Sequence, residues 1–200
     1  MSGLLRVGVL LSGGGTNLQA ILDAAGAEYE VVVVVSDRAD AFGLERARRA
    51  GVPAVHVDPP AHDGRGAFNE ALADVLREHH VELVCLAGFM RILAPNFVKA
   101  FENRILNIHP ALLPAFPGAH AVGDALEWGA KVTGATVHLV DEEVDHGPIL
   151  LQRAVPVESG DDEETLHERI KATEHELYPE AIRLFAAGRV KIEGRRATIF

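Results

Sequence analysis

The stretch RVGVLLSGGGTNL, residues 6–18, joins an apolar run to three glycines and then to the start of an amphipathic segment. The run Arg6–Leu11 predicts a strand, and the segment from Leu18 to Ala25 predicts a helix. A strand that leads through glycines into a helix presents backbone N–H groups and the positive end of the helix dipole to an anion. The loop is neither a Walker loop nor a full dinucleotide fingerprint, so a tight structural turn explains it about as well as a phosphate site.

The same alternation of strand and helix continues along the first half of the chain. The five valines Val31–Val35 predict a strand that is buried on both faces, as parallel sheets require. Further strands are expected at 54–57, 83–86 and 105–108, and further helices at 41–50, 66–80 and 95–101. Regular alternation predicts an α/β fold, a Rossmann-like, mostly parallel sheet flanked by helices.

The regular alternation of predicted strands and helices ends at Pro110. A Pro- and Gly-rich loop over 110–118 leads to a short helix at 122–128, and two longer strands are expected at 132–140 and 149–157, joined through 141–148. This predicts an antiparallel addition to the sheet. A helix from about Asp162 to Ala187 is expected to bend at Pro179, because proline removes a helix hydrogen bond. The tail, 190–200, predicts a hairpin.

Length and composition favour a single domain over 1–200, with a mononucleotide-binding lobe at 1–110 and a second lobe at 111–200. The net charge of −10 argues against nucleic-acid binding, which needs a basic face. The single cysteine, Cys85, cannot form an internal disulfide and is expected to be a small buried apolar residue. No segment resembles a signal peptide or a membrane span, so we expect a soluble, cytoplasmic protein without a membrane partner.

Three chemically distinct side chains follow predicted strand ends in the second half. Asn107 and His109 lie in Asn-Ile-His-Pro, and Asp145 begins Asp-His-Gly-Pro. Attack of an amine on an acyl carbon makes an oxyanion, which Asn107 and a protonated His109 can stabilise. A nearby carboxylate favours the imidazolium by raising its pKa, and can help to move the amine's proton to the leaving group. An Asn-x-His motif alone is more often structural, so its geometry has to support this chemistry.

Ligands of open parallel sheets bind beyond the carboxyl ends of the strands. Gly13, Met90, Asn107 and His109 all lie at or just after such ends, and we expect them on one rim of the sheet. The loop Met90–Leu93 is too apolar for an ordinary exposed loop. It could wall a flat ligand or pack in the core, and the pattern alone leaves both open.

Further motifs occur in a fixed order: SGGGTNL at 12–18, LAGFMRIL at 86–93, HPALLP at 109–114, FPGAH at 116–120, GATVH at 134–138 and EHELYP at 174–179. In this order they closely resemble the phosphoribosylglycinamide formyltransferases, folate-dependent enzymes of purine synthesis. The resemblance runs from about Val7 to Val190. It implies the formyltransferase fold and transfer of the formyl group of 10-formyltetrahydrofolate to the amino group of glycinamide ribonucleotide.

The resemblance also implies roles for individual residues. Asn107 and His109 would stabilise the oxyanion, Asp145 would relay protons through water, and His109 would then protonate the departing folate nitrogen. Glycinamide ribonucleotide would contact Gly15, Thr16, Asn17, Lys171 and Glu174. The folate would contact Arg65, Met90, Arg91, Ile92, Leu93, Asn107, Asp141, Glu142, Glu143, Val144 and Asp145, which makes 111–200 the folate and active-site lobe. Without the resemblance, an ordinary solvated ion pair is the preferred interpretation of Lys171 and Glu174.

No metal is expected, because EHELYP lacks the second histidine of a zinc-protease helix and the chain has no cysteine pair. His138 is expected to support the site from a neighbouring strand, and His120 to belong to a mobile lid. The chain departs from the family pattern at Gly14, where relatives often carry Asn, and at Ala111, where Ser is common. We expect a monomer or a homodimer.

Other functions fit parts of the sequence. A nicotinamide-dependent dehydrogenase would use Gly13 and Gly15, with Asp37 about 22 residues further on. A silent nucleotide-binding module would bind without turnover. Methionyl-tRNA formyltransferases share the Asn-x-His core but add an RNA-binding domain. The 10-formyltetrahydrofolate hydrolases are nearer, and form the main alternative, but usually carry an extra N-terminal domain.

Overall fold

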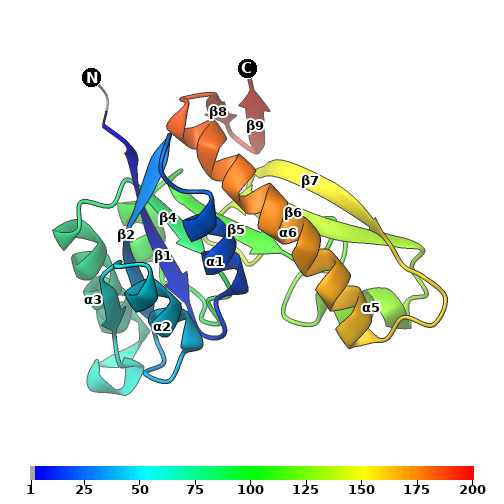
Figure 1. Cartoon of the computed structure of the whole chain (residues 1–200), viewed down its shortest axis with the longest axis horizontal. Helices are drawn as coiled ribbons and strands as arrows, with labels where there is room; N and C mark the ends of the chain where they lie inside the picture. Colours follow the sequence, from blue (N-terminus) through cyan, green and yellow to red (C-terminus); the bar gives the residue numbers. More distant parts are fainter. Residues whose placement is uncertain (1–2) are drawn as a thin grey trace. The chain divides into compact units, whose positions relative to one another are not determined.

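The computed structural model describes residues 3–200, which divide into two compact units, one ending at Leu106 and the other beginning at Asn107. Both units combine strands with helices, which confirms the expected α/β class (Figure 1). The division falls inside strand β5, Ile105–His109, whereas the sequence pattern places the end of the regular alternation at Pro110.

The first unit is a parallel sheet with helices. Its strands are β1 (Leu5–Leu11), β2 (Tyr29–Ser36), β3 (Ala54–His56) and β4 (Leu83–Leu86), in the order β3-β2-β1-β4, and the start of β5 lies beside β4. All three pairings among β1 to β4 are parallel. The helices are α1 (Thr16–Asp23), α2 (Phe42–Arg49), α3 (Gly64–Glu78) and α4 (Pro95–Ala100), with a short 3-10 turn at Pro59–Ala61.

The valine run forms the expected buried strand. Val33, Val34 and Val35 are fully buried, although their side chains point alternately to opposite faces of the sheet. A parallel sheet needs such two-sided burial because its crossover helices cover both faces. The ends of these strands position the loops that follow Leu11 and Leu86.

The second unit adds the antiparallel pairing. It contains the end of β5, then α5 (Ala121–Glu127), β6 (Val132–Leu139), β7 (Ile149–Pro156), α6 (Glu163–Ala186), β8 (Val190–Glu193) and β9 (Arg196–Ile199). β5 lies beside β6, and the order continues β6-β7-β9-β8, with β6 and β7 antiparallel. β8 and β9 form the expected C-terminal hairpin, and β9 runs parallel to β7.

The long helix α6 packs on β6 and β7 (Figure 1). A reciprocal capping box starts it, in which Asp162 accepts from the Thr165 N–H and the Thr165 hydroxyl accepts from the Asp162 N–H. The helix runs on through Pro179, which is buried. Over residues 3–200 no helix has the length and apolar character that crossing a membrane would take.

Candidate active site

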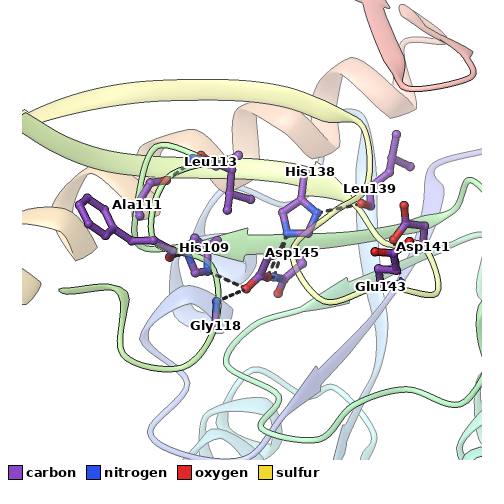
Figure 2. Close-up of polar contacts among 12 residues, drawn as sticks. His109, Ala111, Leu113, Gly118, His138, Leu139, Asp141, Glu143 and Asp145 are labelled. Carbon is purple, nitrogen blue, oxygen red and sulfur yellow. Dashed lines mark hydrogen bonds and ion pairs between the residues drawn. The ribbon is translucent and has the colours of Figure 1, made fainter. Parts of the chain in front are cut away.

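Strand β5 presents its two polar side chains on one side. Asn107 and His109 are two residues apart, so they face the same way along the strand. Figure 2 shows that His109 and His138, which comes from the neighbouring β6, converge on Asp145 from the loop between β6 and β7. The structure therefore brings together the three side chains that the sequence motifs single out.

The imidazole of His109 lies between a carbonyl group and a carboxylate. Its Nε2 is 2.7 Å from the Phe116 carbonyl oxygen, and its Nδ1 is 3.4 Å from Oδ2 of Asp145. A carbonyl oxygen only accepts hydrogen bonds, so Nε2 carries a proton and Nδ1 is the nitrogen that can gain or lose one. With a side chain only 4% exposed, His109 can exchange a proton with Asp145 largely shielded from bulk water.

Asn107 and His138 form the other side of the cluster. The Asn107 Nδ2 lies 3.1 Å from His138 Nε2 and 3.5 Å from Oδ1 of Asp145. His138 Nδ1 lies 2.8 Å from the Leu139 carbonyl oxygen and therefore carries a proton. When neutral, His138 accepts from the Asn107 amide through Nε2, which fixes the amide's orientation.

At neutral pH both titratable partners, His109 and Asp145, lack their dissociable proton. Burial lowers the pKa of His109 below its ordinary value, although Asp145 and the Phe116 carbonyl act to raise it. Asp145 therefore acts on the His109 pKa in the expected direction, but desolvation outweighs the carboxylate, and the lowered net pKa contradicts the expectation of a protonated His109. Burial acts to raise the pKa of Asp145, but its contacts with His138, the Gly118 N–H and His109 lower it by more. The resting pair is a neutral imidazole beside a carboxylate.

Backbone contacts hold Asp145 in place. Its Oδ2 accepts a hydrogen bond of 2.8 Å from the Gly118 N–H, and its own φ of 52° lies in the left-handed region. Such a conformation costs a non-glycine residue about 1 kcal/mol or more and persists where the surroundings determine it. Behind it, Gly147 packs so closely on the Leu139 carbonyl that a Cβ would lie 2.0 Å from that oxygen. The close approach fixes the base of the loop.

The loop after His109 is tied to β6 by its backbone. The Thr136 hydroxyl donates to the Ala111 carbonyl at 2.6 Å and accepts from the Leu113 N–H at 3.1 Å. Gln152 of β7 donates to the Leu113 carbonyl. Ala111 is fully buried, and its hydrogen bond with Thr136 uses the backbone carbonyl, so these ties would also form with the serine common in relatives. Thr136 and His138 are two residues apart in β6 and so share one face of the strand. This spacing in the sequence could have predicted that Thr136 supports the site.

The acidic loop that carries Asp145 is fastened at both ends. Asp141 accepts from the Glu143 N–H through Oδ1, and its Oδ2 lies 2.7 Å from Nδ1 of His146. Arg195, in the turn of the β8–β9 hairpin, contacts the same imidazole. Glu142, Glu143 and Val144 are exposed between these ties. The exposed His146 therefore joins this loop to the C-terminal hairpin.

The glycine-rich loop of the first unit has the geometry of an anion-binding turn. Gly15 caps α1 with a φ of 72°, and Thr16 and Asn17 open the helix. Gly13 and Gly14 are exposed, and Gly15 has no side chain to cap the first N–H groups of the helix. Gly14 contributes backbone only, so the departure from the family's Asn leaves this arrangement intact.

The loop Met90–Leu93 is an exposed apolar surface. Met90 and Ile92 are 75% and 60% exposed, so the core-packing alternative is wrong for these two side chains. Ser12 accepts from the Met90 N–H at 2.9 Å, and Arg91 forms an ion pair of 2.6 Å with the buried carboxylate of Asp37. The Asp37 Oδ2 is thereby occupied and its Oδ1 is buried, which removes the carboxylate that a dehydrogenase would offer to a ribose.

A buried asparagine joins Arg65, to which the family resemblance assigns a folate contact, to Ala94, which directly follows the Met90–Leu93 loop. Asn69 donates to the Arg65 carbonyl and accepts from the Ala94 N–H, at 2.9 and 3.0 Å. Arg65 itself is exposed in the first turn of α3, next to this contact. Sequence reasoning missed Asn69, whose role depends on a contact between residues 25 positions apart.

Lys171 and Glu174 of α6 do not form a simple solvated ion pair with each other. Lys171 forms an ion pair of 2.6 Å with Glu168, one turn earlier, while Glu174 is only 4% exposed. Burial of a carboxylate is costly and is rare outside paired or functional sites. Within residues 3–200, no group of three or more His, Cys, Asp or Glu residues is arranged to hold a metal ion.

Comparison with known proteins agrees with this geometry. The formyl transferase family model matches residues 5–182. A phosphoribosylglycinamide formyltransferase of Mycobacterium tuberculosis is 52% identical over 97% of this chain and 91% of its own length. The crystal structure of glycinamide ribonucleotide transformylase 1 from Symbiobacterium toebii is 60% identical, with a TM-score of 0.97 over 98% of this chain and 94% of that one.

A third relative is much longer than this chain. The trifunctional purine biosynthetic protein adenosine-3 of Gallus gallus is 50% identical over 94% of this chain, which spans only about a fifth (19%) of that relative's length. The match nevertheless covers most of the sequence, and the shared fold includes both units. The chain therefore belongs to the formyl transferase family, in the branch that holds the phosphoribosylglycinamide formyltransferases.

Proposed function

We propose that this protein transfers the formyl group of 10-formyltetrahydrofolate to the amino group of glycinamide ribonucleotide, a step of purine biosynthesis. The observation that carries the proposal is the convergence of Asn107, His109 and His138 on Asp145. The names of the relatives support the same reaction. A cytoplasmic location and a monomeric or homodimeric state stay predictions.

The first chemical step is attack of the substrate amine on the formyl carbon. The carbonyl π bond breaks as the C–N bond forms, and the oxygen becomes an oxyanion. The amine must then lose a proton, which the Asp145–His109 pair can accept because the resting imidazole is neutral. The resulting imidazolium is absent in the ground state and present when the oxyanion forms. It therefore stabilises the intermediate selectively.

Asn107 supplies a second stabilising group. One of its N–H donors faces His138, and its longer contact of 3.5 Å with Asp145 is weak enough to yield to a stronger acceptor such as an oxyanion. Collapse of the intermediate breaks the bond from the formyl carbon to the folate nitrogen. His109 returns the proton to that nitrogen, so the proton balance closes without a nucleophilic side chain.

The family resemblance supplies the binding roles, and the exposed surfaces of the loops support them. The exposed apolar side chains of Met90 and Ile92 suit one face of a pterin, with Arg65, Arg91, Leu93 and the acidic segment 141–145 as further folate contacts. Gly15, Thr16 and Asn17 would bind the phosphate and ribose region of glycinamide ribonucleotide. Lys171 and Glu174 would contact the same substrate. No metal takes part in this scheme.

The decisive test follows loss of the formyl group from 10-formyl folate by absorbance, with and without glycinamide ribonucleotide. Strictly acceptor-dependent loss supports the transferase. An equal rate without the acceptor would identify a hydrolase and overturn the substrate assignment.

Two variants test the site. Because an amide cannot take the amine's proton, Asp145→Asn should lower kcat by roughly 10²- to 10³-fold, the range seen for loss of one stabilising group. The kcat of His109→Ala should fall at least as far. In both variants folate binding, measured by fluorescence titration, should weaken far less than kcat falls, because the other folate contacts remain. Asp74→Asn, an exposed carboxylate of α3, is the control for charge removal. A near-wild-type rate in Asp145→Asn would remove Asp145 from the mechanism.

A further inference from the structure

Helix α2 packs directly on the glycine-rich loop of the first unit. The Gly43 N–H donates to the Gly13 carbonyl at 3.0 Å, and Arg46 Nε donates to the Gly14 carbonyl at 2.8 Å. A Cβ on Gly15 would lie 2.8 Å from the Gly43 Cα, so the two backbones are in close contact. α2 thus holds two consecutive peptide groups of the loop.

These two hydrogen bonds determine where the loop's donors point. In a trans peptide the C=O and the following N–H lie on opposite sides. Because the carbonyls of Gly13 and Gly14 face α2, the N–H groups of Gly14 and Gly15 face away from it. Within the described part of the chain, no protein group accepts from these two N–H groups. Successive free N–H groups in such a turn form a nest for an anion.

Arg46 is well suited to fix this arrangement. Besides the Gly14 carbonyl, its guanidinium donates to the Gln19 side chain of α1 at 3.0 Å, so it bridges the loop and the helix that follows. Its planar group also lies 5.0 Å from the centre of the Phe42 ring. Two hydrogen bonds from its planar fork and the ring contact limit its rotation, a combination that lysine cannot reproduce.

Arg46 also keeps an uncompensated charge beside the loop. Of the three arginines in α2, Arg48 and Arg49 both form ion pairs with Glu45. Among the described residues no carboxylate pairs with Arg46. Its positive charge therefore adds to that of the helix terminus, and both attract a phosphate group.

We propose that Arg46 is the positioning residue of the phosphate loop. It turns the loop's carbonyls inward and so presents the Gly14 and Gly15 N–H groups to the phosphate of glycinamide ribonucleotide. The proposal rests on the proposed function and extends it to a residue that itself touches neither reacting group.

The test compares Arg46→Ala and Arg46→Lys with Arg49→Ala. The control removes the same charge from the same helix and also contacts the Phe42 ring, but it touches no loop carbonyl. Arg46→Ala should raise KM for glycinamide ribonucleotide by roughly tenfold, as expected for loss of a charge-assisted hydrogen bond. The kcat and KM for 10-formyl folate should change less than about twofold. The KM of Arg46→Lys for glycinamide ribonucleotide should lie between those of the wild type and Arg46→Ala, and the KM of Arg49→Ala should match that of the wild type.

Calorimetric titration with glycinamide ribonucleotide in the absence of folate separates the possible failures. If the wild type does not bind this ligand, the proposed function fails. If the wild type binds and Arg46→Ala binds equally well, the positioning role is refuted while the function stands. An equal loss in Arg46→Ala and Arg49→Ala would assign the effect to net charge and would also refute positioning.

Discussion

Replacing Gly147 by alanine should displace the loop that carries Asp145. An added Cβ would lie 2.0 Å from the Leu139 oxygen, 2.9 Å from its carbonyl carbon and 3.3 Å from the Asp141 nitrogen. Gly147 does not have a positive φ, so alanine accepts the backbone conformation and the conflict is one of space alone. The backbone cannot simply separate, because the Leu139 N–H donates to the Pro148 carbonyl at 2.8 Å.

The size of the displacement follows from the contact. Real Cβ atoms stay at least 3.0 Å from other heavy atoms, so the two backbones must separate by about 1 Å. Overpacking of this kind costs roughly 1–3 kcal/mol, which corresponds to a fall in Tm of about 2–12 °C for a chain of this size. The same carbonyl accepts from His138, so the shift reaches both His138 and Asp145. A misplacement of about 1 Å lowers activity by roughly 10²-fold.

The assay measures Tm by calorimetry and acceptor-dependent deformylation for Gly147→Ala beside Gly123→Ala. The nearest atom to a Cβ at Gly123, in α5, is 3.6 Å away, an ordinary contact. That control should gain about 0.5–1 kcal/mol, since glycine inside a helix is unfavourable relative to alanine. Wild-type Tm and kcat in Gly147→Ala would refute the account of how the loop is held.

Two further predictions concern charge. Burial lowers the pKa of His109, so as the pH falls the imidazole is protonated in the unfolded chain before it is protonated in the folded one. The free energy of unfolding is therefore highest above about pH 6.5, the ordinary pKa of histidine, and decreases as the pH falls below that value. Urea unfolding at pH 7.5 and 5.5 should show a smaller pH effect in His109→Gln than in the wild type, and an unchanged effect would contradict the burial argument. Asp37→Asn should release Arg91 and raise KM for 10-formyl folate by about three- to tenfold, with a similar kcat. The control Asp40→Asn, which changes an exposed carboxylate, should leave this KM unchanged. If Asp37→Asn has the wild-type KM, Arg91 does not contribute to folate binding.

The fold follows from local sequence patterns. Continuous runs of β-branched residues such as Val31–Val35 form strands buried on both faces, and the Asp162 cap marks the start of α6. Asn107 and His109 share a strand face because their spacing is two. Asp145 could be placed beside them only through the family resemblance, since a loop position has no periodicity.

The electrostatic and positioning features of the site could not be predicted from local sequence patterns. The net pKa direction of His109 depends on how deeply the imidazole is buried, and its Nε2 partner is a backbone carbonyl that no side-chain pattern marks. Arg46, Asn69 and the Asp37–Arg91 pair act through contacts between distant positions. Such contacts exist only once the chain has folded.

The single thiol of the chain can serve as an internal reporter of unfolding. Cys85 lies in β4, between β1 and the start of β5, and is completely buried. A thiol reagent can therefore react only when this unit opens, and no second cysteine complicates the signal. The labelling rate of the native protein would give the opening free energy of the first unit without any engineered probe.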